Sequence, residues 1–115
     1  SYSKDHSSDE AGLIPNAHLD FFDNLRLCYE TDKYIFVHAG LKSNIPLEEQ
    51  DVWDMLWVRD EFIYSDFDFG KRVIFGHTPF RKPRILDNKI GIDTGAVYGN
   101  KLTCVELPAV KFYSV

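Results

Sequence analysis

The sequence has few of the features that mark secreted, membrane-embedded or disulfide-bonded proteins. It contains only two cysteines, Cys28 and Cys104, which stand in apolar contexts with no close spacing to each other or to a histidine. We interpret both as core thiols in a reducing compartment. No apolar run approaches the roughly 20 residues of a membrane helix, and the first residues lack the core of a signal peptide. These absences predict a cytoplasmic chain with no membrane contact.

Positive charge is also scarce. The chain carries 13 Lys and Arg against 18 Asp and Glu, a formal net charge of −5. Only Lys71-Arg72 and the segment 81–84 are dense in basic residues. Because binding to a nucleic-acid polymer depends on neutralising many phosphates, this balance argues against such a partner. A single phosphate site is still compatible with it.

What is present is the composition of an ordinary globular domain. The 115 residues are 44% hydrophobic and 15% aromatic, which fits one folded unit. Residues 1–13 are polar and aperiodic, so we expect a loop or a cut end there, and residues 14–115 form the folded part. Helical patterns come early and strand patterns late, which favours an α+β (mixed α/β) fold over a regular βαβ repeat.

Local patterns predict the individual elements. Apolar residues recur at helical spacing over 17–27, and a second helical pattern begins at 47 and places Val52, Met55 and Leu56 on one face. Residues 57–63 would be the end of that helix or the loop after it. Strands are expected at 28–31, where a turn is the alternative, and at 34–37, 72–75, 89–93, 102–107 and 110–115. Gly99-Asn100 is the candidate hairpin turn.

Two histidines share one sequence pattern. Phe36-Val37-His38-Ala39-Gly40 and Ile74-Phe75-Gly76-His77-Thr78 each place a histidine where an apolar strand gives way to small residues. Ligands bind at the carboxyl ends of strands in open α/β sheets, and neutral imidazole is a good ligand for Zn, Mn, Fe or Ni. The alternative is that each ring is simply hydrogen-bonded at the sheet edge. We predict that the rings of His38 and His77 converge on a common point.

Asp93 is the nearest carboxylate candidate. It ends a third predicted strand and is followed by Thr94-Gly95. With His38 and His77 it would form a two-histidine, one-carboxylate triad of the non-haem iron type. The alternative is that its carboxylate accepts hydrogen bonds from the turn that follows. The sequence leaves both interpretations open.

Arg59 is the candidate phosphate-binding residue. It follows the apolar segment 56–58, and a guanidinium held by packing presents a fork of donors to phosphate. The alternative is an ion pair with Asp60 or Glu61 on a helix surface. The remaining polar candidates are expected at the surface, the last three in a solvated helical turn: His6, His18, Glu48, Glu49 and Asp51.

Four segments stand in a distinctive order: His38-Ala39-Gly40, then 56–61, then Gly76-His77-Thr78, then 91–99. In this order they resemble the carboxyl-terminal half of the phosphoprotein phosphatases, within the calcineurin-like metallophosphoesterase superfamily. The resemblance extends over nearly the whole chain from about residue 14. The segment from Asp93 to Glu106 looks closer to bacterial-type serine/threonine phosphatases and symmetrical diadenosine tetraphosphate hydrolases than to the large eukaryotic enzymes. It implies half of a β-sandwich flanked by helices.

The resemblance also implies a chemistry. Members of the family hold two metal ions, and an activated water attacks phosphorus. His38 and His77 match two histidine ligands of one ion, Arg59 matches an arginine that grips phosphate oxygens, and three further residues match the surroundings of the ligands: Asp93, Thr94 and Tyr98. The resemblance therefore implies divalent Mn, Fe, Zn or Ni in a binuclear site of the intact enzyme, with at most one ion weakly held by this chain.

The motifs of the family's first half are absent. Gly-Asp does not occur in the chain, and no asparagine directly precedes a histidine. We therefore expect a fragment of an enzyme for phosphoserine or phosphothreonine proteins or dinucleoside polyphosphates, inactive alone. Its partners would be that substrate and the missing amino-terminal half, and its exposed sheet surface favours self-association. The alternative is a non-catalytic binding or scaffold module that retains the fold.

Overall fold

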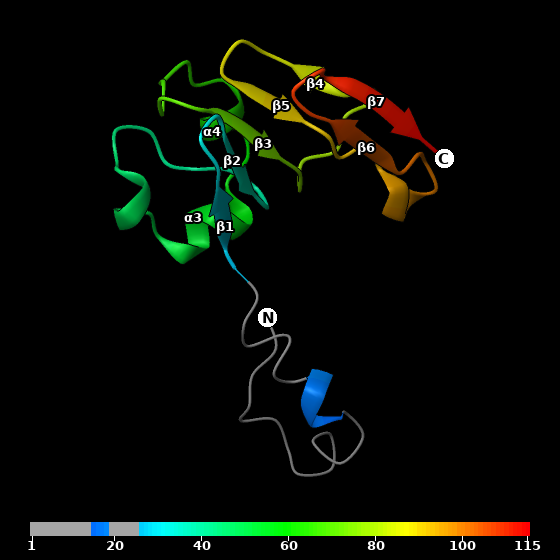
Figure 1. Ribbon diagram of the computed structural model, residues 1–115, viewed down its shortest axis with the longest axis horizontal. Helices are drawn as coiled ribbons and strands as arrows, with labels where there is room; N and C mark the ends of the chain where they lie inside the picture. Colours follow the sequence, from blue (N-terminus) through cyan, green and yellow to red (C-terminus); the bar gives the residue numbers. More distant parts are fainter. Residues whose placement is uncertain (1–14, 19–25) are drawn as a thin grey trace.

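The folded part of the chain is built around one mixed β-sheet (Figure 1). The computed structural model describes residues 15–18 and 26–115. The loop or cut end predicted at 1–13 and most of the helix predicted at 17–27 lie outside the described residues. Within them, no helix has the length and apolar character needed to cross a bilayer.

The sheet has five strands in the order β1-β2-β3-β5-β4. They are β1 (Cys28–Glu30), β2 (Tyr34–Val37), β3 (Arg72–Phe75), β4 (Arg84–Ile85) and β5 (Lys89–Gly91). The central strands β2, β3 and β5 are parallel, and the edge strands β1 and β4 are antiparallel to their neighbours. Ile35, Val73 and Ile90 are almost fully buried, as expected for the apolar centre of a parallel sheet. The α+β prediction is confirmed.

Short helices lie against one face of this sheet: η1 (Leu47–Glu49), α3 (Val52–Trp57) and α4 (Asp60–Ile63). The single pattern predicted from residue 47 onward is divided, because the backbone at Gln50 is extended and Asp51 caps α3. The Asp51 carboxylate accepts a hydrogen bond from the Trp53 N–H at 2.7 Å. Residues 57–63, predicted as a helix end or loop, contain α4 as a separate helix.

The hydrophobic core lies between the sheet and helices α3 and α4. Val37 and Phe75 from the sheet meet Met55 and Phe62 from the helices, and the rings of Phe62 and Phe75 pack edge to face with centroids 5.1 Å apart. Val52 was predicted to share the buried helix face with Met55, but it is 46% exposed. The break at residues 50–51 turns the first residue of α3 away from the core, which explains the error.

The last two strands, β6 (Thr103–Glu106) and β7 (Lys111–Ser114), pair with each other in a separate two-stranded sheet. Their turn is at 107–110, so the hairpin turn predicted at Gly99-Asn100 is wrong. Those two residues follow η2 (Ala96–Tyr98), and the Asn100 N–H donates to the Gly95 carbonyl at 3.0 Å. In Figure 1 this hairpin lies beside β4 and β5.

The cysteines differ from the prediction that both lie in the core. Both are free thiols, but Cys28 is half-buried and Cys104 is exposed. Successive side chains on a strand point to opposite faces, and Cys104 lies on the exposed face of β6 together with Glu106. Burial and the nearby Glu30 carboxylate raise the pKa of Cys28.

An aromatic cluster covers the face of β1 and β2 that points away from α3 and α4. Tyr29, Tyr34 and Phe36 form this cluster, and the Phe36 ring lies 6.3 Å and 6.2 Å from the other two between centroids. Tyr29 is 53% exposed. We call these three residues the open sheet face. Nearby, a cleft of about 470 Å³ reaches from Arg26 to His38 along β1, β2 and β3.

Candidate metal and phosphate site

Three parallel strands bring the predicted polar residues to one edge of the sheet. His38, His77 and Asp93 follow the last residues of β2, β3 and β5. The His38 carbonyl accepts a hydrogen bond from the Gly76 N–H at 2.7 Å, which fixes the two strand ends side by side. Apolar strand runs that stop at small residues produce this edge, as open α/β sheets require of a ligand site.

The two imidazoles converge there, as predicted. His38 Nε2 and His77 Nδ1 lie 3.2 Å apart, and the ring centroids are 5.0 Å apart. Two nitrogen ligands bound at about 2.1 Å, with an angle of about 90–110° between them, stand about 3.0–3.4 Å apart. The observed separation therefore fits two ligands of one ion as well as a direct hydrogen bond between the rings. The ligand role itself stays a prediction.

His77 has an uncommon backbone conformation. Its φ is 68°, and the Thr78 N–H donates to the Gly76 carbonyl at 2.7 Å, so the three residues form a γ-turn. Positive φ is rare outside glycine, although histidine tolerates it better than most residues, and this type of γ-turn is strained. Strained backbone of this kind concentrates at functional sites. The turn ends β3 sharply and leaves Nδ1 facing His38.

The surroundings of the His77 ring disfavour its protonated form. Burial, followed by the charges of Arg59 and His38, lowers the pKa of His77 below its usual value, and Asp93 and the Trp57 main chain act in the opposite direction. Its Nε2 is buried without a well-formed hydrogen bond among the described residues, although the Trp57 main chain is near. Because a metal binds the unprotonated nitrogen, this environment suits a ligand whose Nδ1 remains free.

Two imidazoles are not a complete metal site. Within residues 15–18 and 26–115, no group of three or more His, Cys, Asp or Glu side chains could hold an ion. Most protein sites for Zn, Mn or Fe use at least three protein ligands. The residues present therefore fit part of a site, and Asp93 does not complete an iron triad with them.

Arg59 lies beside the histidines. It is exposed between α3 and α4, and its carbonyl accepts the N–H groups of Phe62 and Ile63 at 3.0 Å, which anchors its main chain. Its positive charge is close enough to lower the pKa of His77. In the described part of the chain no ion pair joins it to Asp60 or Glu61, and the pair that does form there is Lys71–Glu30 at 2.7 Å. Among the described residues, no carboxylate therefore competes with an anion for the Arg59 guanidinium.

The three surrounding residues have different environments. Asp93 Oδ1 accepts the Gly95 N–H at 2.9 Å, the turn contact that the sequence left open. Thr94 is buried, and its hydroxyl donates to the Lys101 carbonyl at 2.6 Å. Tyr98 is 75% exposed and forms neither a hydrogen bond nor a ring contact with the described histidines. Asp93 is thus near the histidines, Thr94 holds the following turn, and Tyr98 is not brought to them.

Trp57 is a neighbour that the sequence did not assign to the site. Its ring meets the His77 ring edge-on, with centroids 5.6 Å apart and planes at 88°. From the sequence alone, Trp57 is predicted only to contribute apolar surroundings to Arg59. The signal that was present is the pair Trp53 and Trp57, which share a helix face at four-residue spacing.

Comparison of the sequence with known proteins identifies relatives of this chain. A bis(5'-nucleosyl)-tetraphosphatase (PrpE, asymmetrical) of Oceanobacillus iheyensis is 49% identical over 126 aligned residues, which cover 95% of this chain and 50% of the relative. The chain belongs to the metallophosphoesterase family. Its Halalkalibacterium halodurans relative of the same name is 44% identical over 43 residues, 37% of this chain and 18% of the relative.

Solved structures agree on the metallophosphoesterase fold. The crystal structure of a candidate diadenosine tetraphosphatase superposes with a TM-score of 0.75 at 20% identity, covering 94% of this chain and 58% of that one. No model of a protein family matches the chain. This metallophosphoesterase chain spans about half the length of the curated relatives it matches. Their names specify the asymmetrical type, whereas the sequence resemblance pointed to the symmetrical type.

Proposed function

We propose that the protein to which this chain belongs hydrolyses dinucleoside polyphosphates, and that this chain supplies one half of the active site. The observation that carries the proposal is the 3.2 Å approach of His38 Nε2 to His77 Nδ1 at the edge of the sheet. The names of the relatives add the substrate class and favour asymmetrical cleavage. Two imidazoles at a separation that suits one metal ion, with a guanidinium nearby, match the groups that metal-assisted phosphoester hydrolysis uses.

Each residue has a distinct role in this proposal. His38 Nε2 and His77 Nδ1 would hold a divalent ion, whose chemistry when bound would be Lewis-acid activation of water and polarisation of a phosphoryl oxygen. Arg59 donates to the phosphate oxygens and offsets charge as it develops on them. Asp93 keeps its turn in place beside His77 and favours the protonated His77 ring. Among Mn, Fe, Zn and Ni, we propose Mn²⁺ as the first ion to test.

The remaining ligands come from another segment of polypeptide. Two imidazoles bind one ion weakly, so we propose that this chain alone has no activity and that an amino-terminal half of the same fold completes a binuclear site. The open sheet face, Tyr29, Tyr34 and Phe36, is the apolar surface that this half would cover. We also propose a reducing, cytoplasmic setting, supported by the two free thiols.

Complementation tests the proposal. The chain is mixed with a separately produced amino-terminal half of a curated relative and Mn²⁺, and hydrolysis of diadenosine tetraphosphate is followed by chromatography of the products. We expect ATP and AMP to form on mixing, with no turnover by either half alone. His77→Asn abolishes this activity, whereas His18→Asn, which alters an exposed histidine outside the site, leaves it unchanged.

The other outcomes assign a different function. Release of phosphate from phosphoserine peptides, with no cleavage of the dinucleotide, would make the intact protein a protein phosphatase. A stable complex of the two halves that hydrolyses neither substrate would identify a binding or scaffold module. Two ADP molecules as products would retain the enzyme but replace asymmetrical by symmetrical cleavage.

A further inference from the structure

Two large aromatic side chains are exposed on α3. Trp53 is 70% exposed and Trp57 is 58% exposed, and these are the two tryptophans of the chain. Their ring planes are inclined by only 26°, with centroids 6.4 Å apart. Four-residue spacing on a helix places both on the same side. Tryptophan is highly buried on average, so an exposed pair with aligned ring planes marks a surface that binds something.

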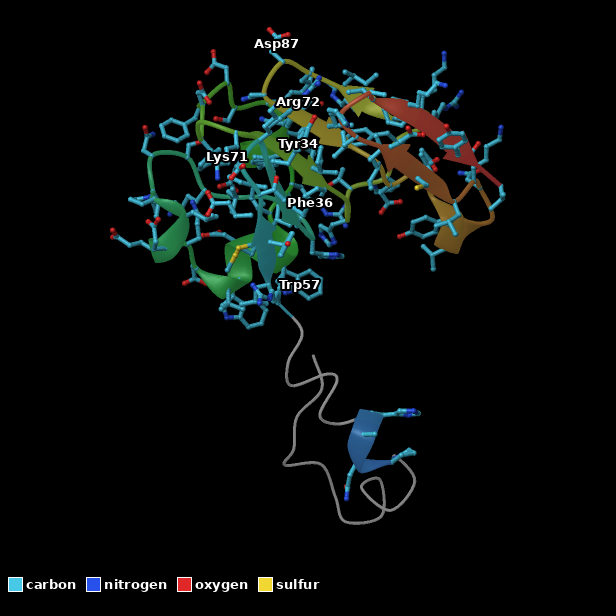
Figure 2. All side chains as sticks on the ribbon, in the orientation of Figure 1. Tyr34, Phe36, Trp57, Lys71, Arg72 and Asp87 are labelled. Atoms are coloured by element: carbon cyan, nitrogen blue, oxygen red, sulfur yellow. The ribbon has the colours of Figure 1, made fainter. Side chains whose placement is uncertain are left out.

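This pair adjoins the candidate metal and phosphate site. The Trp57 ring contacts the His77 ring edge-on at 5.6 Å, and Arg59 follows two residues later in the chain. Figure 2 shows Trp57, the last residue of α3, at the edge of the folded part opposite Asp87. A molecule whose phosphate reached the histidines and Arg59 would therefore lie with its neighbouring group against the tryptophans.

The charge around α3 restricts which part of a bound molecule can lie against the two tryptophans. The segment 47–58 carries four carboxylates, Glu48, Glu49, Asp51 and Asp54, and neither Lys nor Arg. Such a surface repels phosphate, whereas an uncharged aromatic ring stacks on indole without an ion partner. The first cation after this segment is Arg59. The surface is therefore apolar and acidic along α3 and becomes favourable to anions only at the site itself.

We propose that Trp53 and Trp57 form a stacking platform for the nucleobase next to the attacked phosphate. The inference rests on the proposed function, because it assumes a nucleotide substrate whose phosphate lies at His38, His77 and Arg59. Stacking of one base on an aromatic side chain changes binding by about tenfold. A platform that directly adjoins the phosphate site holds the nucleoside one phosphate away from the reacting centre. That placement favours cleavage near one end of the polyphosphate.

Tryptophan fluorescence tests the platform directly, because both emitters belong to it. The chain is titrated with AMP and, as the base-free probe, with ribose 5-phosphate, with excitation above the absorption of adenine. We expect saturable quenching by AMP and none by ribose 5-phosphate. Trp57→Leu weakens AMP binding about tenfold, with Trp53 as the remaining reporter, and Trp57→Phe restores part of it. Tyr64→Leu, which removes an exposed aromatic on another element, leaves AMP binding unchanged.

Results that overturn the platform differ from those that overturn the enzyme. The stacking proposal is contradicted if AMP and ribose 5-phosphate give equal fluorescence responses. It is also contradicted if Trp57→Leu binds AMP with wild-type affinity. Protection of both tryptophans from acrylamide by an added amino-terminal half, with loss of AMP binding, contradicts it as well. In the complemented enzyme, Trp57→Leu should lower kcat/KM for diadenosine tetraphosphate about tenfold more than it lowers kcat/KM for inorganic tripolyphosphate, which carries no base. AMP quenching without any hydrolysis would support the platform and reject the proposed function.

Discussion

At the scale of single residues, the site depends on positions where the backbone or the space allows few side chains. His77 has a φ of 68° in a γ-turn that ends β3. Gly40, two residues after His38, lies directly against Phe62, and a Cβ atom there would overlap that ring. Gly40 lies just after the end of β2, which carries His38, and His77 lies just after the end of β3. Substitutions at these two residues therefore separate the chemistry of the site from the packing that supports it.

Gly40→Ala should destabilise the chain by about 2 kcal/mol, because the new methyl group forces Phe62 out of its edge-to-face contact with Phe75. Thermal unfolding followed by circular dichroism measures the change. Gly70→Ala is the control: a Cβ there meets no atom within 4 Å, so only its positive φ of 84° contributes, at about 1 kcal/mol. Equal losses in the two variants would contradict the packing argument.

At His77, side-chain chemistry and backbone strain can be separated. His77→Asn and His77→Ala both remove an imidazole and should weaken Mn²⁺ or Ni²⁺ binding roughly tenfold or more, measured by calorimetric titration. Asparagine adopts positive φ readily and alanine does not, so His77→Ala should be about 1 kcal/mol less stable than His77→Asn. Unchanged ion binding in both variants would remove His77 from the ligand set.

At the scale of elements, a buried lysine joins α4 to the sheet. Lys89, the first residue of β5, is 1% exposed, and its ammonium donates to the carbonyls of Phe62 and Ser65 at the end of α4. The ammonium also lies 4.4 Å from the centroid of the Phe62 ring. Carbonyls at the end of a helix lack partners within the helix, and a cation there satisfies them. Lys89 therefore fixes the short helix that follows Arg59.

Lys89→Met should cost about 2 kcal/mol of folding free energy, because the buried carbonyls lose their donor while the apolar stem is kept. Urea unfolding measures this loss. Lys111→Met, at an exposed position on β7, is the matched control and should change stability by less than about 0.5 kcal/mol. A Lys89→Met variant as stable as the wild type would mean that water satisfies these carbonyls.

At the scale of the whole molecule, the open sheet face of Tyr29, Tyr34 and Phe36 is partly uncovered by the described residues: Tyr29 is exposed, and Tyr34 and Phe36 are half-buried. Aromatic surface of this kind promotes association between copies. Two observations support the proposal that this face belongs to half of a larger fold: the chain spans about half the length of its curated relatives, and its candidate metal site lacks a third ligand among the described residues. In the function proposed above, the same face would govern both the solubility of the chain and its pairing with an amino-terminal half.

Sedimentation velocity should detect concentration-dependent association of the chain alone. Phe36→Glu places a charge in the centre of the open sheet face and should shift the distribution toward monomer. Tyr64→Glu changes an exposed aromatic residue outside that face and should leave association unchanged. An added amino-terminal half should replace self-association by a one-to-one complex. A wild-type chain that stays monomeric at high concentration would contradict this account.

The elements that the sequence determined are those with strong local patterns. Strands β2 and β3 follow from short apolar runs rich in β-branched residues, and the small residues after them predict strand ends that carry His38 and His77. The order of the motifs was enough to indicate the family. Parallel pairing then brings such strand ends to one edge, so the meeting of the two imidazoles was also predictable.

Only the tertiary structure decided the features that depend on residues far apart in the chain. The two-residue strand β4 exists because it pairs with β5, and Cys104 is exposed because of the face of β6 on which it lies. The γ-turn at His77 and the contact of its ring with Trp57 arise where β3 ends against α3. Local propensity carries no information about such contacts, because their free energy is gained only when distant segments pack together.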